Sequence, residues 1–246
     1  MPTRVYAPAL TPDTSSLDLP AEEADHLSRV LRVRPGADVR VFNGQGLECE
    51  AVVTRVSKHV VAVDVRRFVS PARECRVRIT LAQAVLKGDK LDDVIRDAVM
   101  LGVAAIQPIL TTRTDVPGSA FSQGGRVERW RRIAVSSVKQ CGRAVVPDVH
   151  APVSLAEGLA RDRSDVRVLL SEPAAGENSG LAALRAVPSA SSALVLIGPE
   201  GGWAPDEVAE AVRHGAIPVT LGRRTLRADA TAIVALSVLL HLWGDL

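Results

Sequence analysis

The stretch LVLIGPEGGWAPDE, residues 194–207, decides the interpretation of the fold. An apolar strand runs into a glycine-rich turn, and Pro205 followed by two acids favours the start of a helix. Such a loop lies at the carboxyl end of a strand, where open α/β sheets bind ligands. Glycines let the backbone approach a ligand closely, and a carboxylate such as Glu200 inside a tight turn is hard to explain by packing. The spacing is neither GxGxxG nor a Walker loop, and an ordinary strand-to-helix turn remains an alternative.

Strand and helix patterns alternate along the chain around this stretch. Alternation of this kind predicts an α/β fold with a parallel sheet. The helix at 90–101 shows apolar residues at helical spacing and has Gly102 at its end. The predicted strands are 77–81, 103–110, 166–170, 193–197 and 217–221, and the further predicted helices are 127–141 and 230–243.

The first part of the chain, residues 1–70, is predicted to be mostly β. Strands are expected at 39–42, 50–55 and 60–65, with a hairpin-like turn after the first. One short helix fits 20–33, and Pro35-Gly36 then stops it. This pattern indicates a small barrel-like module, joined by a linker near 70–72 to the α/β part.

The amino-acid composition limits the classes of function that are compatible with this sequence. The chain has 246 residues, 47% hydrophobic and 24% charged, which suits a soluble globular protein with a core. A net charge of +2 provides no global basic field, so any RNA-binding surface must be local, and 3% aromatic residues argue against a reader built on base stacking. Cys49, Cys75 and Cys141 fit neither a disulfide framework nor a zinc cluster, and no histidine has metal-ligand spacing, so we expect no metal. With no signal peptide and no membrane segment in the sequence, a reducing cytoplasm is expected.

Three basic segments are candidate functional surfaces. Residues 219–232 form a basic loop that leads into an apolar helix, which Asp229 is placed to cap. Residues 126–143 carry basic residues at helical spacing, a pattern that fits a phosphate track, and residues 26–34 hold a further basic cluster. A solvated charged surface is the alternative for each of them.

A set of short motifs, taken in their order along the chain, resembles the motifs of a known family. The N-terminal ones are HLxxVLR at 26–32 and FNGxG at 42–46. The set continues with KGDK at 87–90, LGV at 101–103, Pro108, Arg113, QCGR at 140–143, Pro147, IGPEGG at 197–202, LG at 221–222, LR at 226–227 and WGDL at 243–246. With these motifs the sequence resembles the small-subunit (16S) rRNA uridine N3 methyltransferases, a branch of the SPOUT class, over nearly the whole chain.

The resemblance implies an architecture and partners. It implies a PUA-like RNA-binding β-barrel domain at 1–70 and a SPOUT methyltransferase domain with a C-terminal trefoil knot at 74–246. It further implies S-adenosylmethionine as cofactor, ribosomal RNA of the small subunit as substrate, and a homodimer. The cofactor-binding residues carried over are Leu170, Ser171, Ile197, Gly198, Pro199, Glu200, Gly201, Gly202, Leu221, Gly222, Leu226, Arg227, Ala228 and Thr231.

Catalytic and RNA-binding residues are hypotheses on the same basis. Uridine N3 carries a proton that must be removed, or its anion stabilised, while the sulfonium methyl lies in line. Arg227 or Arg143 is predicted near the uracil carbonyl or phosphate, and Glu200 or Asp229 is the candidate base or orienting group. The predicted RNA-binding residues are His26, Arg29, Arg32, Arg113, Arg129, Arg132, Lys139 and Arg143.

The sequence departs from the family pattern after Leu226-Arg227. The family has Thr, an acid or Ser, and Thr at these three positions, whereas this chain has Ala228, Asp229 and Ala230. The missing hydroxyls leave open a shift of the polar contact to Thr231 or weaker cofactor binding. Three alternatives therefore stay open: an inactive RNA-binding relative, a SPOUT enzyme acting on another RNA, and a nucleotide-dependent enzyme of doubly wound fold, which the missing GxGxxG disfavours.

Overall fold

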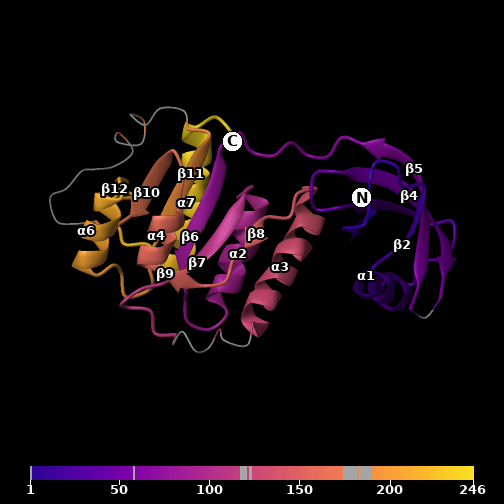
Figure 1. The fold of residues 1–246 in the computed structure, drawn as a ribbon, viewed down its shortest axis with the longest axis horizontal. Helices are drawn as coiled ribbons and strands as arrows, with labels where there is room; N and C mark the ends of the chain where they lie inside the picture. Colours follow the sequence, from indigo (N-terminus) through magenta and orange to yellow (C-terminus); the bar gives the residue numbers. More distant parts are fainter. Residues whose placement is uncertain are drawn as a thin grey trace. The chain divides into compact units, whose positions relative to one another are not determined.

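The computed structural model describes residues 2–57, 59–116, 121, 124–173, 182, 185 and 190–246. These fall into two compact units (Figure 1). The N-terminal unit is Met1–Glu74 with Val135–Val146, and the C-terminal unit is Cys75–Ala134 with Pro147–Leu246. Residues 135–146 thus belong to the first unit, although the predicted boundaries place them in the second domain.

A mixed five-stranded sheet forms the framework of the N-terminal unit. Its order is β1-β3-β4-β5-β2, with β1 parallel to β3 and the other neighbours antiparallel. The strands predicted at 39–42, 50–55 and 60–65 correspond to β3, β4 and β5. The bounds are β1 Thr3–Tyr6, β2 Ser16–Asp18, β3 Asp38–Phe42, β4 Glu48–Val56 and β5 Val61–Val69.

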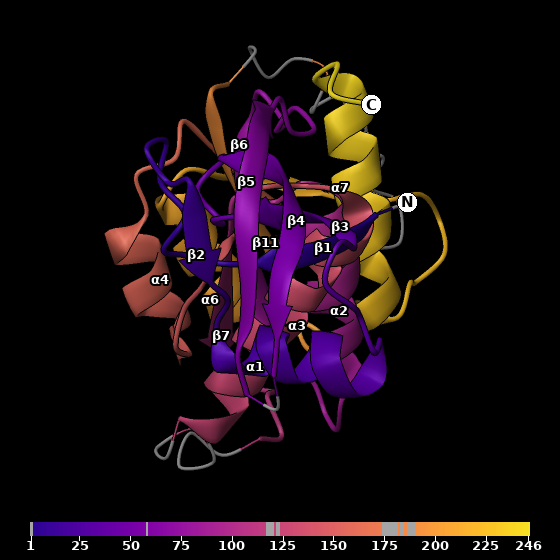
Figure 2. The same ribbon diagram turned by 90° about the vertical axis from the view of Figure 1, so that its right-hand side faces the viewer.

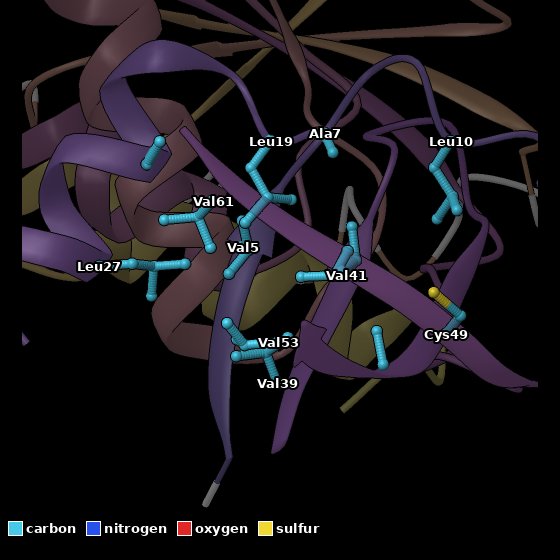
Figure 3. Close-up of a cluster of buried hydrophobic side chains, with 13 residues drawn as sticks. Val5, Ala7, Leu10, Leu19, Leu27, Val39, Val41, Cys49, Val53 and Val61 are labelled. Carbon is cyan, nitrogen blue, oxygen red and sulfur yellow. The ribbon is translucent and has the colours of Figure 1, made fainter. Parts of the chain in front are cut away.

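The core of this unit is a cluster of small branched side chains (Figure 3). Val5, Val41, Val61 and Leu27 are each fully buried and come from three strands and the helical segment. Cys49 lies among them, and burial raises the pKa of its thiol to about 11, so the thiol stays protonated at neutral pH. The alternation of apolar and polar residues along β4 explains why one face of the sheet is buried.

The helix predicted at 20–33 is shorter and less regular in the structure. An α-helical turn, α1 (Ala21–Asp25), passes directly into a π-helix, η1 (His26–Val30). Arg32 has φ +50°, a left-handed conformation that ends the helix before Pro35. The predicted boundary was therefore wrong at its C-terminal end.

The C-terminal unit contains a parallel sheet of seven strands, as the alternating pattern predicted. The order is β12-β10-β11-β6-β7-β8, and β9 also pairs with β7. All pairs are parallel, so the carboxyl ends of the strands meet at one edge. The bounds are β6 Arg78–Ala84, β7 Ala105–Leu110, β8 Asp148–Val149, β9 Val153–Ser154, β10 Val166–Leu170, β11 Ser192–Ile197 and β12 Ala216–Val219.

Helices cover both faces of this sheet. In Figure 2, α4 and α6 lie on one side and α2 and α7 on the other. Leu155 and Leu159 of α4 pack with Leu169, Leu194 and Leu196 of the sheet. The bounds are α2 Lys90–Met100, α3 Gly125–Cys141, α4 Leu155–Arg161, α6 Pro205–Arg213 and α7 Ala228–Leu242. None of the helices in the described part of the chain is long and apolar enough to cross a membrane.

The C-terminal segment is tied back to the start of β6. One carboxylate oxygen of Asp245 accepts the backbone N–H of Arg76 at 3.0 Å, and the other accepts that of Val77 at 3.2 Å. The Arg76 guanidinium donates to the carbonyl oxygen of Gly244 at 2.8 Å. Burial is the largest single influence on the pKa of Asp245 and opposes ionisation, but these N–H groups and Arg76 together outweigh it and lower the pKa.

Replacing Asp245 by asparagine should lower the free energy of unfolding of the C-terminal unit at pH 7 by about 1 kcal/mol. A carboxyl whose pKa is lowered by folding stabilises the fold above its unfolded pKa and loses that contribution as the pH falls through the folded pKa. The difference between variant and parent should therefore shrink below roughly pH 4. Urea unfolding between pH 3 and 7 measures it, and a difference that does not depend on pH would contradict this account.

Candidate active site

A pocket of about 280 Å³ opens at the carboxyl edge of the parallel sheet. Three loops form it: the segment after β10, the glycine-rich loop after β11, and the segment between β12 and α7. Its lining residues are Leu170, Ser171, Glu172, Pro173, Ile197, Gly198, Pro199, Glu200, Gly202, Trp203, Leu221, Arg224, Thr225, Leu226, Arg227, Ala228, Asp229 and Thr231.

The glycine-rich loop is held in place by Trp203. Its indole N–H donates to the carbonyl oxygen of Leu170 at 2.8 Å, which joins the loop to the end of β10. A side chain at Gly198 would meet the Trp203 ring at 3.1 Å, so the ring packs directly on the glycine backbone. Gly202 has φ +68°, a conformation that L side chains rarely adopt. The two glycines thus allow the loop to fold tightly at the pocket.

The loop after β7 is attached to the same glycine-rich segment. Buried Glu207 accepts the backbone N–H of Thr112 at 2.7 Å and that of Ala204 at 2.9 Å. The Arg113 guanidinium donates to the carbonyl oxygen of Gly201 at 2.9 Å. Glu207 therefore both caps α6 and positions a neighbouring loop, and Arg113 lies beside the glycines.

Glu200 is engaged by its neighbours on the β6–α2 side. Its carboxylate accepts from the Lys90 ammonium at 2.7 Å and from the Lys87 backbone N–H at 3.3 Å. Burial is the largest influence on the pKa of Glu200 and would raise it, but Lys90 and the backbone N–H groups together lower it. A carboxylate with a lowered pKa is a weaker base, so this geometry favours a positioning role for Glu200 over proton removal.

Arg227 and Asp229 form a pair at the entrance to α7. The Arg227 Nε donates to Oδ1 of Asp229 at 3.2 Å, and the arginine side chain is 72% exposed. The expectation that Asp229 caps α7 was wrong: Arg227 occupies the N-cap position, and Asp229 lies in the first turn with no capping bond. The helix begins two residues earlier than predicted because the Arg227 carbonyl already accepts the N–H and the hydroxyl of Thr231, at 2.8 and 2.9 Å.

The structure brings the predicted cofactor-binding residues together. All of them line the pocket except Gly201 and Gly222, which lie in the same two loops. The sequence analysis missed five further lining residues, although each is a close neighbour of a predicted one in the chain. They are Glu172, Pro173, Trp203, Arg224 and Thr225.

The predicted RNA-binding residues are dispersed between the two units. In the N-terminal unit, His26, Arg29 and Arg32 are exposed. Lys139 donates to both carboxylate oxygens of Glu23 at 2.8 Å.

Arg143 is buried in the N-terminal unit and paired through two nitrogens with Glu74. This pairing gives its guanidinium a structural partner and lends no support to the catalytic role predicted for it.

The basic face of α3 is partly neutralised in the C-terminal unit. Arg129 contacts Asp92 at 2.5 Å and Asp89 at 3.4 Å. Arg132 donates to the Glu128 carbonyl oxygen at 3.4 Å. The ion pairs of Arg129 weaken the expected phosphate track along this helix.

Comparison with known proteins adds the family. An RNA methyltransferase domain model matches residues 73–240, and an RNA methyltransferase PUA domain model matches residues 19–65. The chain belongs to the ribosomal RNA small subunit methyltransferase E family. A member of this name from Synechocystis sp. is 31% identical across 91% of this chain and 72% of its own length. One from Mycobacterium bovis is 31% identical across 92% of this chain and 86% of its own.

Solved structures of similar proteins share the whole fold. A ribosomal RNA small subunit methyltransferase E from Neisseria gonorrhoeae, bound to S-adenosyl methionine, has a TM-score of 0.88 and 31% identity, with 99% of this chain and 98% of that chain covered. A putative methyltransferase from Legionella pneumophila, in complex with the cofactor SAM, has a TM-score of 0.86 and 31% identity over 98% of both chains. Within the described residues of this family member, no group of three or more His, Cys, Asp or Glu could hold a metal ion.

Proposed function

We propose that this chain transfers a methyl group from S-adenosylmethionine to N3 of a uridine in 16S ribosomal RNA. The observation that carries the proposal is the convergence of the three loops at one pocket, because the cofactor-binding residues carried over from the family resemblance supply most of its wall. Two similar structures with the bound cofactor support it further. The trefoil knot and a cytoplasmic location belong to the same proposal and stay predictions.

The pocket residues suit this cofactor chemically. The apolar side chains against which an adenine ring can pack are those of Leu170, Ile197 and Leu226. The carboxylates available to a cationic ligand are those of Glu172 and Asp229. When bound, S-adenosylmethionine supplies an electrophilic methyl group on a positively charged sulfur. The hydroxyl of Thr231, the candidate substitute for the hydroxyls absent at 228 and 230, is bonded to the Arg227 carbonyl, so it helps to shape the pocket.

We assign to Arg227 the role of stabilising the negative charge that develops on the uracil base. For N3 to act as a nucleophile, uridine must lose its N3 proton, which passes to solvent water at the open pocket, and this loss leaves negative charge on the uracil ring. A guanidinium beside the ring stabilises this anion, and it does so best when its own geometry is fixed in advance. Asp229 supplies that fixation through its bond to Nε of Arg227, and is therefore proposed as a positioning residue.

Glu200 is proposed to hold the glycine-rich loop and not to act as the base. Its bonds to Lys87 and Lys90 connect this loop to the segment that enters α2. These contacts would keep the pocket wall in one conformation before the substrate arrives, which is how placement contributes to rate.

The proposed active form is a homodimer, and α7 supports it. Ile233 and Val234 of this helix are 38% and 37% exposed, an apolar pair on the surface of the C-terminal unit. We expect the substitution Val234→Asp to shift the mass measured by light scattering from dimer to monomer, because a charge at the interface stays unpaired. Val212→Asp on α6, where valine is 46% exposed, is the matched control and should leave the mass unchanged. A monomeric parent protein would contradict the proposal.

Calorimetric titration tests the cofactor assignment. Saturable binding of S-adenosylmethionine, with none of NAD, supports the methyltransferase. No binding by the folded protein would favour an inactive RNA-binding relative, with Ala228 and Ala230 as the first residues to restore to threonine.

A further inference from the structure

Two large apolar side chains lie exposed on the surface of the N-terminal unit. Val30 is 66% exposed and Leu31 44% exposed, and they are consecutive in the chain. Leu27, one turn earlier, is fully buried in the core of the unit and anchors the segment. We refer to Val30 and Leu31 as the apolar tip. The two consecutive side chains form a small apolar patch, the kind of surface feature from which a recognition site is built when further observations point to a ligand.

The backbone that presents the apolar tip is unusual. The tip ends the π-helix η1, where the Leu31 N–H donates to the His26 carbonyl at 3.1 Å, five residues back. Arg32 follows in the left-handed region at φ +50°, the one non-glycine residue with positive φ in the described ranges of the chain. π-Helical turns and left-handed non-glycine residues cost free energy and cluster at functional sites.

Basic side chains flank the tip. Arg32 and Arg34 are exposed, and neither has an acidic partner among the residues whose positions are described. Arg29 lies 3.7 Å from Asp25. The Asp25 carboxylate is also 3.5 Å from the His59 ring, so it contacts both side chains. An apolar projection with two unneutralised arginines beside it complements a polyanion that also offers apolar surface.

We propose that the apolar tip contacts unstacked bases of a single-stranded loop in the RNA substrate, while Arg32 and Arg34 bind the adjoining phosphates. This inference rests on the proposed function, which makes RNA the substrate. Aliphatic side chains serve as wedges against base steps in nucleic-acid complexes, and loops offer the bases that a protein can reach. The arginines give affinity independent of sequence, whereas the tip distinguishes looped from fully paired RNA.

The test compares two fluorescent RNA probes of equal length, a hairpin with an unpaired loop and a blunt duplex. The double substitution Val30→Ser/Leu31→Ser should weaken hairpin binding by about tenfold, because it removes apolar contact area, and leave duplex binding unchanged. Val212→Ser is the matched control for loss of an exposed valine. Arg32→Asn/Arg34→Gln should weaken both probes and reduce the slope of log K against log salt by roughly 1.5, and asparagine tolerates the left-handed backbone.

Two results would overturn the assignment. One is a double serine variant that binds both probes as the parent does. The other is a change in the oligomeric mass of that variant, which would make the tip a contact between copies.

This proposal and the proposed function can fail separately. Methylation of 16S rRNA in small ribosomal subunits by the parent protein tests the proposed function alone. If the parent methylates and the double serine variant keeps its affinity for the hairpin, only the tip proposal fails. If the parent binds neither S-adenosylmethionine nor RNA, both fail.

Discussion

Replacing Arg227 by alanine should lower methyl transfer to 16S rRNA by about 10²- to 10³-fold, the effect of removing a preorganised group that stabilises developing charge. The affinity for S-adenosylmethionine should change by less than about threefold, because the loss acts on the transition state and not on cofactor binding. Single-turnover transfer with saturating cofactor measures the first quantity, and calorimetry the second.

Arg223 provides the matched control in the same loop. It is four residues earlier, is exposed, and is not among the residues that line the pocket. Arg223→Ala should therefore keep transfer near the parent rate. Equal losses in the two variants would show that the loop needs positive charge in general, and unchanged transfer in Arg227→Ala would remove the assigned role.

Replacing Arg4 by alanine should destabilise the N-terminal unit by about 3 kcal/mol. Arg4 donates to both carboxylate oxygens of Glu48, at 3.2 and 3.1 Å, and to the carbonyl oxygens of Val138 and Arg143, both at 2.7 Å. Its guanidinium also lies 4.6 Å from the Phe42 ring centroid. The Glu48 side chain is only 2% exposed, so its charge would lose its main partner where water cannot reach it.

Native-state hydrogen exchange of the β3 and β4 amides measures this effect, because it reports the free energy of opening within the unit itself. Arg66→Ala is the matched control: its pair with Asp38 joins side chains that are 56% and 68% exposed, and its loss should cost at most about 0.5 kcal/mol. Equal and small losses in both variants would contradict the structural role of Arg4.

The α/β architecture was predictable because its signals are local. Apolar strands alternate with helices of regular period, which predicted a parallel sheet with a ligand-binding loop at the carboxyl end of a strand. The meeting of three loops far apart in sequence was implied by the family resemblance alone. The family resemblance supplied most residues of those loops, whereas chain neighbours such as Trp203 and Glu172 were missed.

What the sequence did not reveal depends on contacts between distant residues. The residues near Arg143 in the chain do not predict its partner Glu74, and those near Glu200 do not predict its partner Lys90. These partners nevertheless decide whether each side chain is available for chemistry. Residues 135–146 belong to the N-terminal unit, where Arg4 donates to the carbonyl oxygens of Val138 in α3 and of Arg143 just after it. The left-handed Arg32 is a further case, because helical periodicity carries no information on where strain is tolerated.

The most direct test is to incubate the purified protein with methyl-labelled S-adenosylmethionine and small ribosomal subunits from cells that lack the family enzyme. Mass spectrometry of the digested 16S rRNA then locates the label. We expect one uridine methylated at N3, with no transfer to tRNA or to large-subunit RNA. Label at another base or in another RNA, or no transfer by a protein that binds the cofactor, would contradict the account.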